Sequence, residues 1–190
     1  MKEYEFDLVT TKGGDRGESS LYSQEREVKN SPIFEAVGEL DELNSYFGII
    51  RASLEGSTIK TGLFKSFNLP SEIRGIQKDI MAISSLIATN PMSELYNKLK
   101  QIDEAVINKI EKREIALLKQ TKISEEFIIP GDTGLASAQI DFARALTRRC
   151  ERRIVALIRE RGRIDLIECQ KYLNRLSDLL FILARFVEQS

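Results

Sequence analysis

The sequence predicts an all-α protein folded as a five-helix antiparallel bundle. Apolar residues recur at steps of three and four along five long stretches, which is the spacing of amphipathic helices. All four prolines lie ahead of such stretches, where proline is tolerated, and none lies inside one. Alternating apolar patterns and runs rich in Val or Thr are almost absent, so we expect strands to contribute little.

The first three helices differ in the residues that form their apolar stripes. They are expected at residues 33–55, 71–89 and 93–121. Leu40, Leu43 and Phe47 belong to the stripe of the first helix, whose start Pro32 marks. Isoleucines at the same spacing form the stripe of the second helix, and the third is rich in Lys, Glu and Leu. Each helix is therefore expected to bury one face.

The last two helices are expected at residues 133–161 and 165–188, with stripes that include Leu146 and Leu176. Short connections favour antiparallel neighbours, in the up-down packing of ferritin-like bundles. We expect residues 1–31 to be irregular and residues 55–69 to form a loop. At 190 residues the chain is expected to be a single domain, residues 1–190, with its helical bundle in residues 32–190.

Composition excludes several kinds of protein. The chain has 28 Lys and Arg against 29 Asp and Glu, so any affinity for anions must come from local clusters. It has no histidine, which excludes Ser-His and Cys-His catalysis and disfavours a zinc enzyme. Cys150 and Cys169 are far apart and are interpreted as reduced thiols. With no signal peptide and no apolar run of membrane-spanning length, a cytoplasmic protein is expected.

The stretch "TTKGGDRGESS", residues 10–20, is rich in glycine and in hydrogen-bond donors. Gly13, Gly14 and Gly17 allow backbone conformations that aim N–H groups at an anion. Hydroxyl groups and the charges of Lys12 and Arg16 suit a polyphosphate, although the stretch is neither a Walker A nor a GxGxxG sequence. A flexible polar loop is the alternative interpretation.

The first helix carries a stripe of small residues three or four positions apart. Its members are Gly38, Asp41, Ser45, Gly48 and Ala52. Glycine inside a helix costs about 1 kcal/mol relative to alanine, so a packing or binding reason is expected. Close helix packing and a functional role are both open. Asp41 needs a partner on such a face, and an arginine would serve.

The fourth helix contains "FARALTRRCERR", five arginines in residues 142–153. One face of the helix holds Arg144, Arg148, Glu151 and Arg152, and a neighbouring face holds Arg149 and Arg153. The preference for arginine over lysine favours forked contacts with phosphate oxygens. A solvated basic face is one alternative. A nucleic-acid groove is another, which the acidic net charge and the lack of interleaved aromatic residues disfavour.

Two further positions are candidates for ligand contacts. Asn174 lies within a strongly apolar fifth helix, where a polar side chain needs a hydrogen-bond partner on another helix or a ligand. Phe127 precedes the fourth helix in an apolar run that ends at Pro130. It is interpreted either as a plug at the bundle end or as the lining of a pocket.

Four stretches together resemble a known family. They are "TKGGDRGESSL", "FEAVGELDELNSYFG", "FIIPGDTGLASAQIDFARALTRRCERRIVAL" and "KYLNRLSDLLFILAR". The sequence resembles the PduO-type ATP:cob(I)alamin adenosyltransferases in these four stretches. The stretches occur in the same order as in that family and span nearly the whole chain. The resemblance implies a homotrimeric helical bundle with active sites between subunits, and transfer of the 5′-deoxyadenosyl group of ATP to Co(I) of a reduced corrinoid. It also implies that Mg²⁺ arrives with ATP, without a side-chain metal site predicted for it.

The resemblance assigns roles to single residues. It gives a phosphate-cradling loop within residues 1–31 to Thr11, Lys12, Gly14, Asp15, Gly17, Ser19 and Ser20. Lys29 would also reach ATP, and Arg148, Glu151 and Asn174 would contact the nucleotide, with Arg148 on the phosphates. The chemistry agrees with the residues present, because the nucleophile is the cobalt of the corrinoid and no protein nucleophile is needed.

The resemblance further implies that Arg144 pairs with Asp41 across the subunit interface, so that Asp41, Arg144 and Arg148 are the expected catalytic residues. Phe127 would lie below the corrin ring and exclude the lower axial ligand. The sequence departs from the family pattern at Asp141, where the family often has histidine, and at Gly13, where threonine is common. The turn "GDTG" and the length of the loop at residues 55–69 are further departures.

The implied partners are a cob(II)alamin reductase and an adenosylcobalamin-dependent enzyme as a candidate recipient of the product. No nucleic acid and no membrane are expected as partners. A non-catalytic sensor or delivery protein that binds ATP or adenosylcobalamin on the same scaffold is the alternative function. A structural or nucleic-acid-binding bundle is the third hypothesis.

Overall fold

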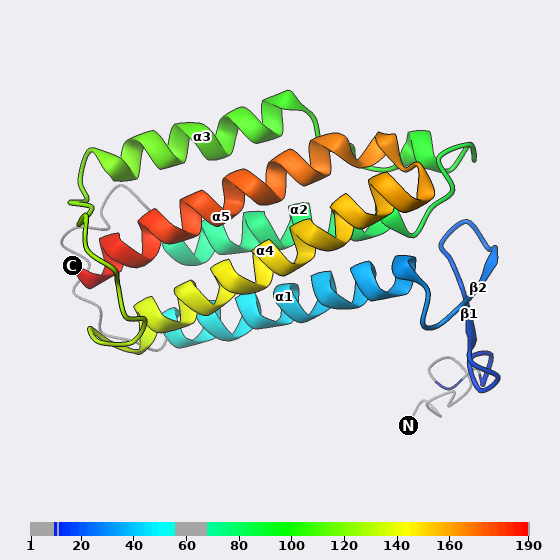
Figure 1. Cartoon of the computed structure of the whole chain (residues 1–190), viewed down its shortest axis with the longest axis horizontal. Helices are drawn as coiled ribbons and strands as arrows, with labels where there is room; N and C mark the ends of the chain where they lie inside the picture. Colours follow the sequence, from blue (N-terminus) through cyan, green and yellow to red (C-terminus); the bar gives the residue numbers. More distant parts are fainter. Residues whose placement is uncertain (1–9, 11, 56–67, 190) are drawn as a thin grey trace, which may run out of the picture.

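The structure, a computed structural model, describes residues 10, 12–55 and 68–189, and over these residues it confirms the predicted five-helix bundle. The helices are α1 (Pro32–Glu55), α2 (Leu69–Ile87), α3 (Glu104–Leu118), α4 (Leu135–Arg161) and α5 (Ile167–Glu188). Consecutive helices run in opposite directions (Figure 1). Most of the predicted loop at residues 55–69 lies outside the described residues.

Helix α4 lies at the centre of the packing. It contacts α1 on one side and α5 on the other, while α2 packs on α1 and α3 lies on the outer side of α5 (Figure 1). The predicted stripes supply the core, in which Leu40, Phe47 and Leu176 are fully buried. Truncating one such side chain to alanine costs about 2–5 kcal/mol, so the stripes fix how the helices face one another.

The prediction of a single helix over residues 93–121 is wrong at its start. The structure has a short 3-10 helix, η3 (Tyr96–Lys98), and then extended backbone at Leu99 before α3 begins. Asp103 ends the interruption because its side chain accepts a hydrogen bond from the Val106 N–H and so caps α3. Tyr96 is buried, so the segment before α3 closes one end of the bundle.

The prediction that residues 1–31 are irregular is also wrong in part. Strands β1 (Glu18–Ser20) and β2 (Arg26–Val28) form an antiparallel hairpin in which Glu18 pairs with Val28. A turn joins the strands, with Gln24 at a φ of 75° and the Leu21 N–H donating to the Glu25 carbonyl. The hairpin projects from the end of the bundle at which α1 begins and α4 ends (Figure 1).

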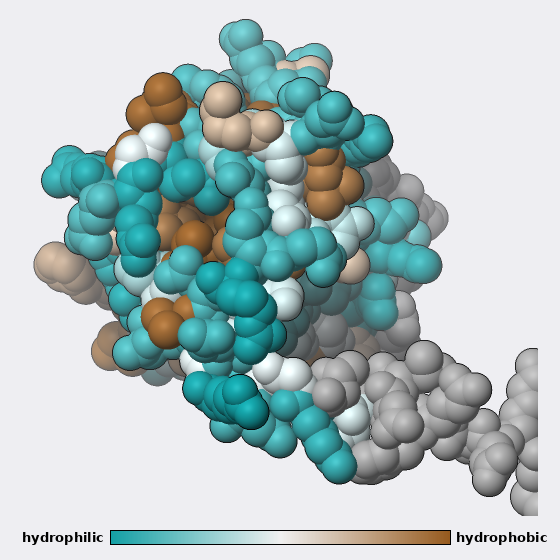
Figure 2. Space-filling model, turned by 90° about the vertical axis from the view of Figure 1, so that its right-hand side faces the viewer, coloured by the Kyte–Doolittle hydropathy of each residue, from teal (hydrophilic) through white to brown (hydrophobic). Residues whose placement is uncertain are grey.

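Viewed from the hairpin side, the surface is largely hydrophilic with small apolar patches (Figure 2). Among the helices that the structure describes, none has the length and apolar character needed to cross a membrane.

Candidate functional site

The glycine-rich stretch is a tight loop at the base of the hairpin. The Gly17 N–H donates to the Gly14 carbonyl at 3.2 Å, and the Lys29 N–H donates to the Gly17 carbonyl at 2.9 Å. Gly17 has a φ of 81°, a conformation that favours glycine. The structure thereby joins this loop to Lys29, as the predicted site requires. Of the predicted loop residues, Thr11 lies outside the described part of the chain, and Asp15, Ser19 and Ser20 follow in the loop and β1.

The side chain of Lys29 lies over Gly14. A Cβ atom added at Gly14 would be 2.7 Å from Lys29 Nζ and 3.0 Å from its Cε. Glycine at this position therefore lets a cation lie directly against the loop backbone. Sequence reasoning missed Arg26, whose Nη2 donates to the Gly13 carbonyl at 3.0 Å and so brings a second cation to the loop.

Two of the five arginines in residues 142–153 are neutralised by glutamates of α1. Arg149 pairs with Glu42, and its Nε lies 3.6 Å from Glu39 Oε2. Arg153 Nε lies 2.7 Å from Glu39 Oε1, and its Nη2 lies 3.3 Å from Glu35 Oε2. These ion pairs join α4 to α1. These acidic partners were not predicted, although the three glutamates are spaced three or four residues apart on the first helix.

Arg148 and Arg152 differ from these neighbours. Both are exposed, and neither has an ion-pair or hydrogen-bond partner among the residues that the structure describes. Their guanidinium groups are therefore available to an anion from outside the chain. The predicted phosphate ligand Arg148 has the exposure that this role needs.

Glu151 and Asn174, both predicted to contact the nucleotide, meet across α4 and α5. Asn174 Nδ2 donates to Glu151 Oε1 at 3.4 Å, and Arg175 donates to the Asn174 Oδ1. The three side chains line a cavity of about 380 Å³ together with Glu111 of α3. Of the two kinds of partner predicted for Asn174, the one on another helix is present, and it is a residue of the predicted site.

A half-buried carboxylate, that of Glu114, interacts with Arg175, which lines this cavity. Burial raises the pKa of Glu114 to about 7, and the negative charge of Asp178 adds to the increase while Arg175 opposes it. The Glu114 Oε1 atom is buried and has no hydrogen-bond partner among the residues that the structure describes. The thiols are different, since burial raises the pKa of Cys150 and of Cys169 to about 12, which keeps them protonated and unreactive.

Arg144 is held inside its own chain by Asp141. Arg144 Nε donates to Asp141 Oδ1 at 3.2 Å, and Arg185 Nη2 donates to Asp141 Oδ2 at 2.5 Å. The side chains of Asp141 and Arg185 are only 3% and 4% exposed, so this ion pair is removed from solvent. Asp41 is exposed on α1 and does not pair with Arg144 within the described part of the chain, so the predicted contact between subunits stays a prediction.

Phe127 is fully exposed, with a relative accessibility of 105%. It lines a cavity of about 350 Å³ to which Asp141, Arg144, Phe181 and Arg185 also contribute. Of the two interpretations, the structure therefore favours the lining of a pocket over a plug at the bundle end.

The glycine loop and the segment between α3 and α4, to which Phe127 belongs, lie at opposite ends of the bundle (Figure 1). The hairpin contacts the end of α4 through Arg161, whose Nη2 lies 3.8 Å from Glu27 Oε1. The cavity beside Phe127 reaches the first turns of the same helix. Since α4 has 27 residues, its two ends are separated by about 40 Å. No single small ligand can touch both within one chain.

The small-residue stripe of α1 faces away from its own bundle. Gly38, Asp41, Ser45 and Ala52 are exposed, and only Gly48 is half-buried. Close packing against another helix of the same chain does not explain the exposed positions. Among the described residues, no group of three or more Cys, Asp or Glu side chains is arranged to hold a metal ion.

Comparisons with known proteins agree with the resemblance seen in the sequence. The cobalamin adenosyltransferase family model matches residues 9–187. Corrinoid adenosyltransferase MMAB of Mus musculus is 36% identical over 180 residues, which are 94% of this chain and 71% of that protein. A corrinoid adenosyltransferase of Citrobacter freundii is 34% identical over 181 residues, which are 95% of this chain and 94% of that protein.

Solved structures resemble the whole chain as well. A PduO-type ATP:corrinoid adenosyltransferase from Lactobacillus reuteri, in a phenylalanine-to-histidine variant complexed with cobalamin and ATP, has a TM-score of 0.82 at 28% identity. That match covers 95% of this chain and 91% of the other. An arginine-to-lysine variant of the enzyme from that organism, complexed with ATP, has a TM-score of 0.77 at 30% identity, covering 94% and 93%. The chain belongs to the cobalamin adenosyltransferase family.

Proposed function

We propose that the protein transfers the 5′-deoxyadenosyl group of ATP to the cobalt of a reduced corrinoid. The electron pair of Co(I) forms the bond to the 5′ carbon, the bond from that carbon to the phosphate oxygen breaks, and triphosphate leaves with the electron pair of that bond. The protein then has to position two substrates, stabilise the charge of the leaving triphosphate and exclude water.

The observation that carries this proposal is the contrast along α4. Arg149 and Arg153 are neutralised by glutamates of α1, whereas Arg148 is exposed and has no ion-pair partner among the described residues. An unpaired arginine is suited to bind the phosphate groups of ATP. Glu151 lies one turn further along the helix and is hydrogen-bonded to Asn174, and these two residues would lie beside the nucleoside.

The ATP site is proposed to combine these residues with the glycine loop. The backbone N–H groups of Gly14 and Gly17, with Lys12, Asp15, Ser19 and Ser20 around them, would cradle the phosphates, and Lys29 would add positive charge. Thr11 belongs to the same proposal. Mg²⁺ would enter on the phosphate oxygens, which are its usual ligands beside water.

We propose that the complete site lies between subunits of a homotrimer. The separation of the glycine loop from Phe127 supports this, because a second chain must supply one of the two parts. The outward-facing stripe of α1 supports it too, since small residues allow another subunit to approach closely. In this assembly Asp41 would pair with Arg144 of the neighbouring subunit, in place of or in addition to Asp141.

Phe127 is proposed to lie below the corrin ring and to exclude the lower axial ligand of cobalt. Its full exposure supports this role, because a side chain at the edge of an open cavity can cover one face of a flat substrate. Loss of the lower ligand makes Co(II) easier to reduce to Co(I), which a cob(II)alamin reductase would carry out. An adenosylcobalamin-dependent enzyme is the proposed recipient of the product.

The proposal extends to the organisation of the chain. Residues 1–190 would act as one cytoplasmic adenosyltransferase domain, with residues 1–31 as the nucleotide-binding segment and residues 32–190 as the bundle. The two buried cysteines, which form no disulfide, are consistent with a reducing compartment.

The test is an assay with MgATP and chemically reduced cobalamin, followed by the spectral change that accompanies adenosylcobalamin formation. We expect turnover by the folded protein and release of triphosphate rather than of phosphate and ADP. If the folded assembly binds ATP or adenosylcobalamin tightly but does not turn over, the transferase proposal fails and a sensor or delivery protein takes its place.

A further inference from the structure

The end of α2 is held by one buried arginine. Arg163, which is 8% exposed, donates from Nη1 to the Ile87 carbonyl at 3.0 Å and from Nη2 to the Leu86 carbonyl at 2.8 Å. These carbonyls belong to the last turn of α2, where backbone acceptors have no partner within the helix and a cation is favourable. The guanidinium therefore fixes the last turn of α2 in position.

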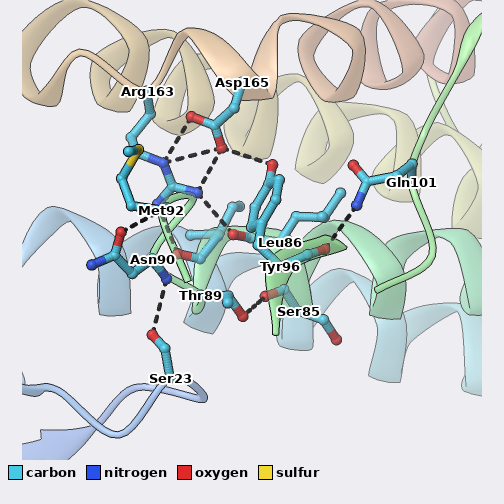
Figure 3. Close-up of polar contacts among 11 residues, drawn as sticks. Ser23, Ser85, Leu86, Thr89, Asn90, Met92, Tyr96, Gln101, Arg163 and Asp165 are labelled. Atoms are coloured by element: carbon cyan, nitrogen blue, oxygen red, sulfur yellow. Dashed lines mark hydrogen bonds and ion pairs between the residues drawn. The ribbon is translucent and has the colours of Figure 1, made fainter. Parts of the chain in front are cut away.

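Asp165 fixes the position of the Arg163 side chain. Its two carboxylate oxygens accept from Arg163 Nε at 3.0 and 3.2 Å, and Arg163 Nη2 donates to its Oδ2 at 2.9 Å. Tyr96 donates its hydroxyl to the same Oδ2 atom at 2.8 Å (Figure 3). Burial alone would raise the pKa of Asp165, but the hydrogen bonds from Arg163 and Tyr96 outweigh it and lower that pKa.

The turn of the N-terminal hairpin docks on the residues that directly follow α2. The Tyr22 N–H donates to the Ala88 carbonyl at 2.8 Å, and the Asn90 N–H donates to Ser23 Oγ at 2.9 Å. Asn90 Nδ2 also donates to Glu25 Oε1 at 3.0 Å. Figure 3 shows Ser23 meeting Asn90 beside the cluster of Arg163 and Asp165. The hairpin is thus held at its tip by the segment that Arg163 fixes.

The other end of the hairpin carries the glycine loop. The Lys29 N–H closes the base of the hairpin on the Gly17 carbonyl, and the Lys29 side chain lies over Gly14. Because the two strands are only three residues long, a displacement at the tip is transmitted to the loop. We infer that Arg163 and Asp165 are positioning residues for the nucleotide loop, acting through the end of α2 and the hairpin docked on it.

This inference rests on the proposed function, because it takes the glycine loop to be an ATP site. It predicts a specific kinetic pattern. When the loop is docked in only a fraction of the molecules, the apparent affinity for ATP is the intrinsic affinity multiplied by that fraction. The turnover of the enzyme saturated with ATP is unchanged. A merely structural arginine would lower the stability of the whole bundle without changing the affinity of the folded fraction for ATP.

The test compares Arg163→Met with Arg113→Met in the full chain. Arg113 of α3 forms an ion pair with Glu72 near the start of α2, so it matches Arg163 as a cation that contacts α2 but lies at the far end of that helix from the hairpin. We expect Arg163→Met to raise KM for ATP by about tenfold, which is a tenfold loss of docked population. In Arg163→Met, kcat and KM for the corrinoid should change less than about twofold. Arg113→Met should leave all three constants near those of the wild type.

Conservative variants complete the design. Arg163→Lys keeps the charge but cannot fork between two carbonyls, so its KM for ATP should lie between those of the wild type and Arg163→Met. Tyr96→Phe, which removes a single hydrogen bond to Asp165, serves if Arg163→Met fails to fold, and it should raise KM for ATP by about two- to threefold, the effect of a typical hydrogen bond. An unchanged KM for ATP in the folded Arg163 variant, or an equal rise in the Arg113 variant, overturns the inference.

Hydrogen exchange gives a readout that does not depend on activity. The amide protons of Tyr22 and Asn90 make the docking hydrogen bonds, so both should exchange faster in Arg163→Met and at the wild-type rate in Arg113→Met. Equal exchange in the two variants overturns the docking role. An inactive but folded wild type, with faster exchange in Arg163→Met alone, would refute the proposed transferase activity and leave the docking role intact.

Discussion

Lys29 and Gly14 are in direct contact at the base of the hairpin, since a Cβ at Gly14 would be 2.7 Å from Lys29 Nζ. This contact places a cation on the backbone of the loop to which the phosphates of ATP are assigned. A methyl group at this position must displace the end of the lysine side chain. The relationship therefore gives a direct test of whether the lysine acts together with the loop.

We expect Gly14→Ala to raise KM for ATP by about fivefold, which corresponds to about 1 kcal/mol of lost binding, with little loss of stability. The flexible end of Lys29 can move aside, so the fold should persist. Gly17→Ala is the matched control, because no atom of the described residues lies within 4 Å of its Cβ position but its φ of 81° strains any other residue. It should lower the melting temperature more than Gly14→Ala does, and an unchanged KM for ATP in Gly14→Ala would contradict the contact.

Arg148→Ala should lower kcat/KM by about 10²–10³-fold, the usual effect of removing a preorganised donor to developing charge. The fold should remain intact, because the side chain is exposed and makes no ion pair with any described residue. The control is Arg149→Ala, one residue further on. Its ion pairs with Glu39 and Glu42 join α4 to α1, so its effect should be on stability, by at most about 1 kcal/mol. Equal losses of activity in the two variants would refute the assignment of Arg148.

Arg144→Ala should weaken assembly as well as activity, because Arg144 is proposed to meet Asp41 of another subunit. Sedimentation velocity over a range of protein concentrations measures the assembly directly. Asp41→Asn should have the same effect on assembly, whereas Arg148→Ala should leave it unchanged. A stable trimer of Arg144→Ala, or a wild type that stays monomeric, would refute the proposed contact.

Glu114 should make stability fall as pH rises. Its pKa in the folded protein is raised to about 7 from an ordinary value of 4.5, so between these two values the folded state binds more protons than the unfolded state. The free energy of unfolding contributed by this group therefore decreases from about pH 4.5 to about pH 7. Urea unfolding across this range should show Glu114→Gln gaining stability relative to the wild type. The exposed Glu125→Gln serves as the control, and parallel profiles for all three proteins would contradict the prediction.

Much of the bundle was predictable because the core helices bury continuous apolar stripes. Phe47, Leu146 and Leu176 lie where helical spacing places them, fully or almost fully buried. The third helix was predicted too long because its composition is helix-forming throughout, while Asp103 starts a new helix by capping it. The hairpin was missed because strands of three residues show no alternation, and its turn is held by contacts with Ala88 and Asn90 that lie far away in the sequence.

The site was predictable in its residue types and less so in their pairing. Glu151 and Asn174 were both predicted from the resemblance, and the structure brings them together. Which arginines of α4 are neutralised depends on the rotation of α1 against α4, and helical spacing alone does not determine that rotation. The histidine-to-aspartate departure at Asp141 could be read from the sequence, but its burial against Arg185 could not, because the two residues are 44 positions apart.

The separation of the glycine loop from Phe127 has a genetic consequence. If each working site takes its loop from one chain and its corrinoid-facing end from a neighbour, a defect in one part of a chain disables only one of the two sites to which that chain contributes. Two inactive variants, one altered in the loop and the other at Phe127, should then restore partial activity when their subunits are mixed. A homogeneous assembly of either variant has no such rescue.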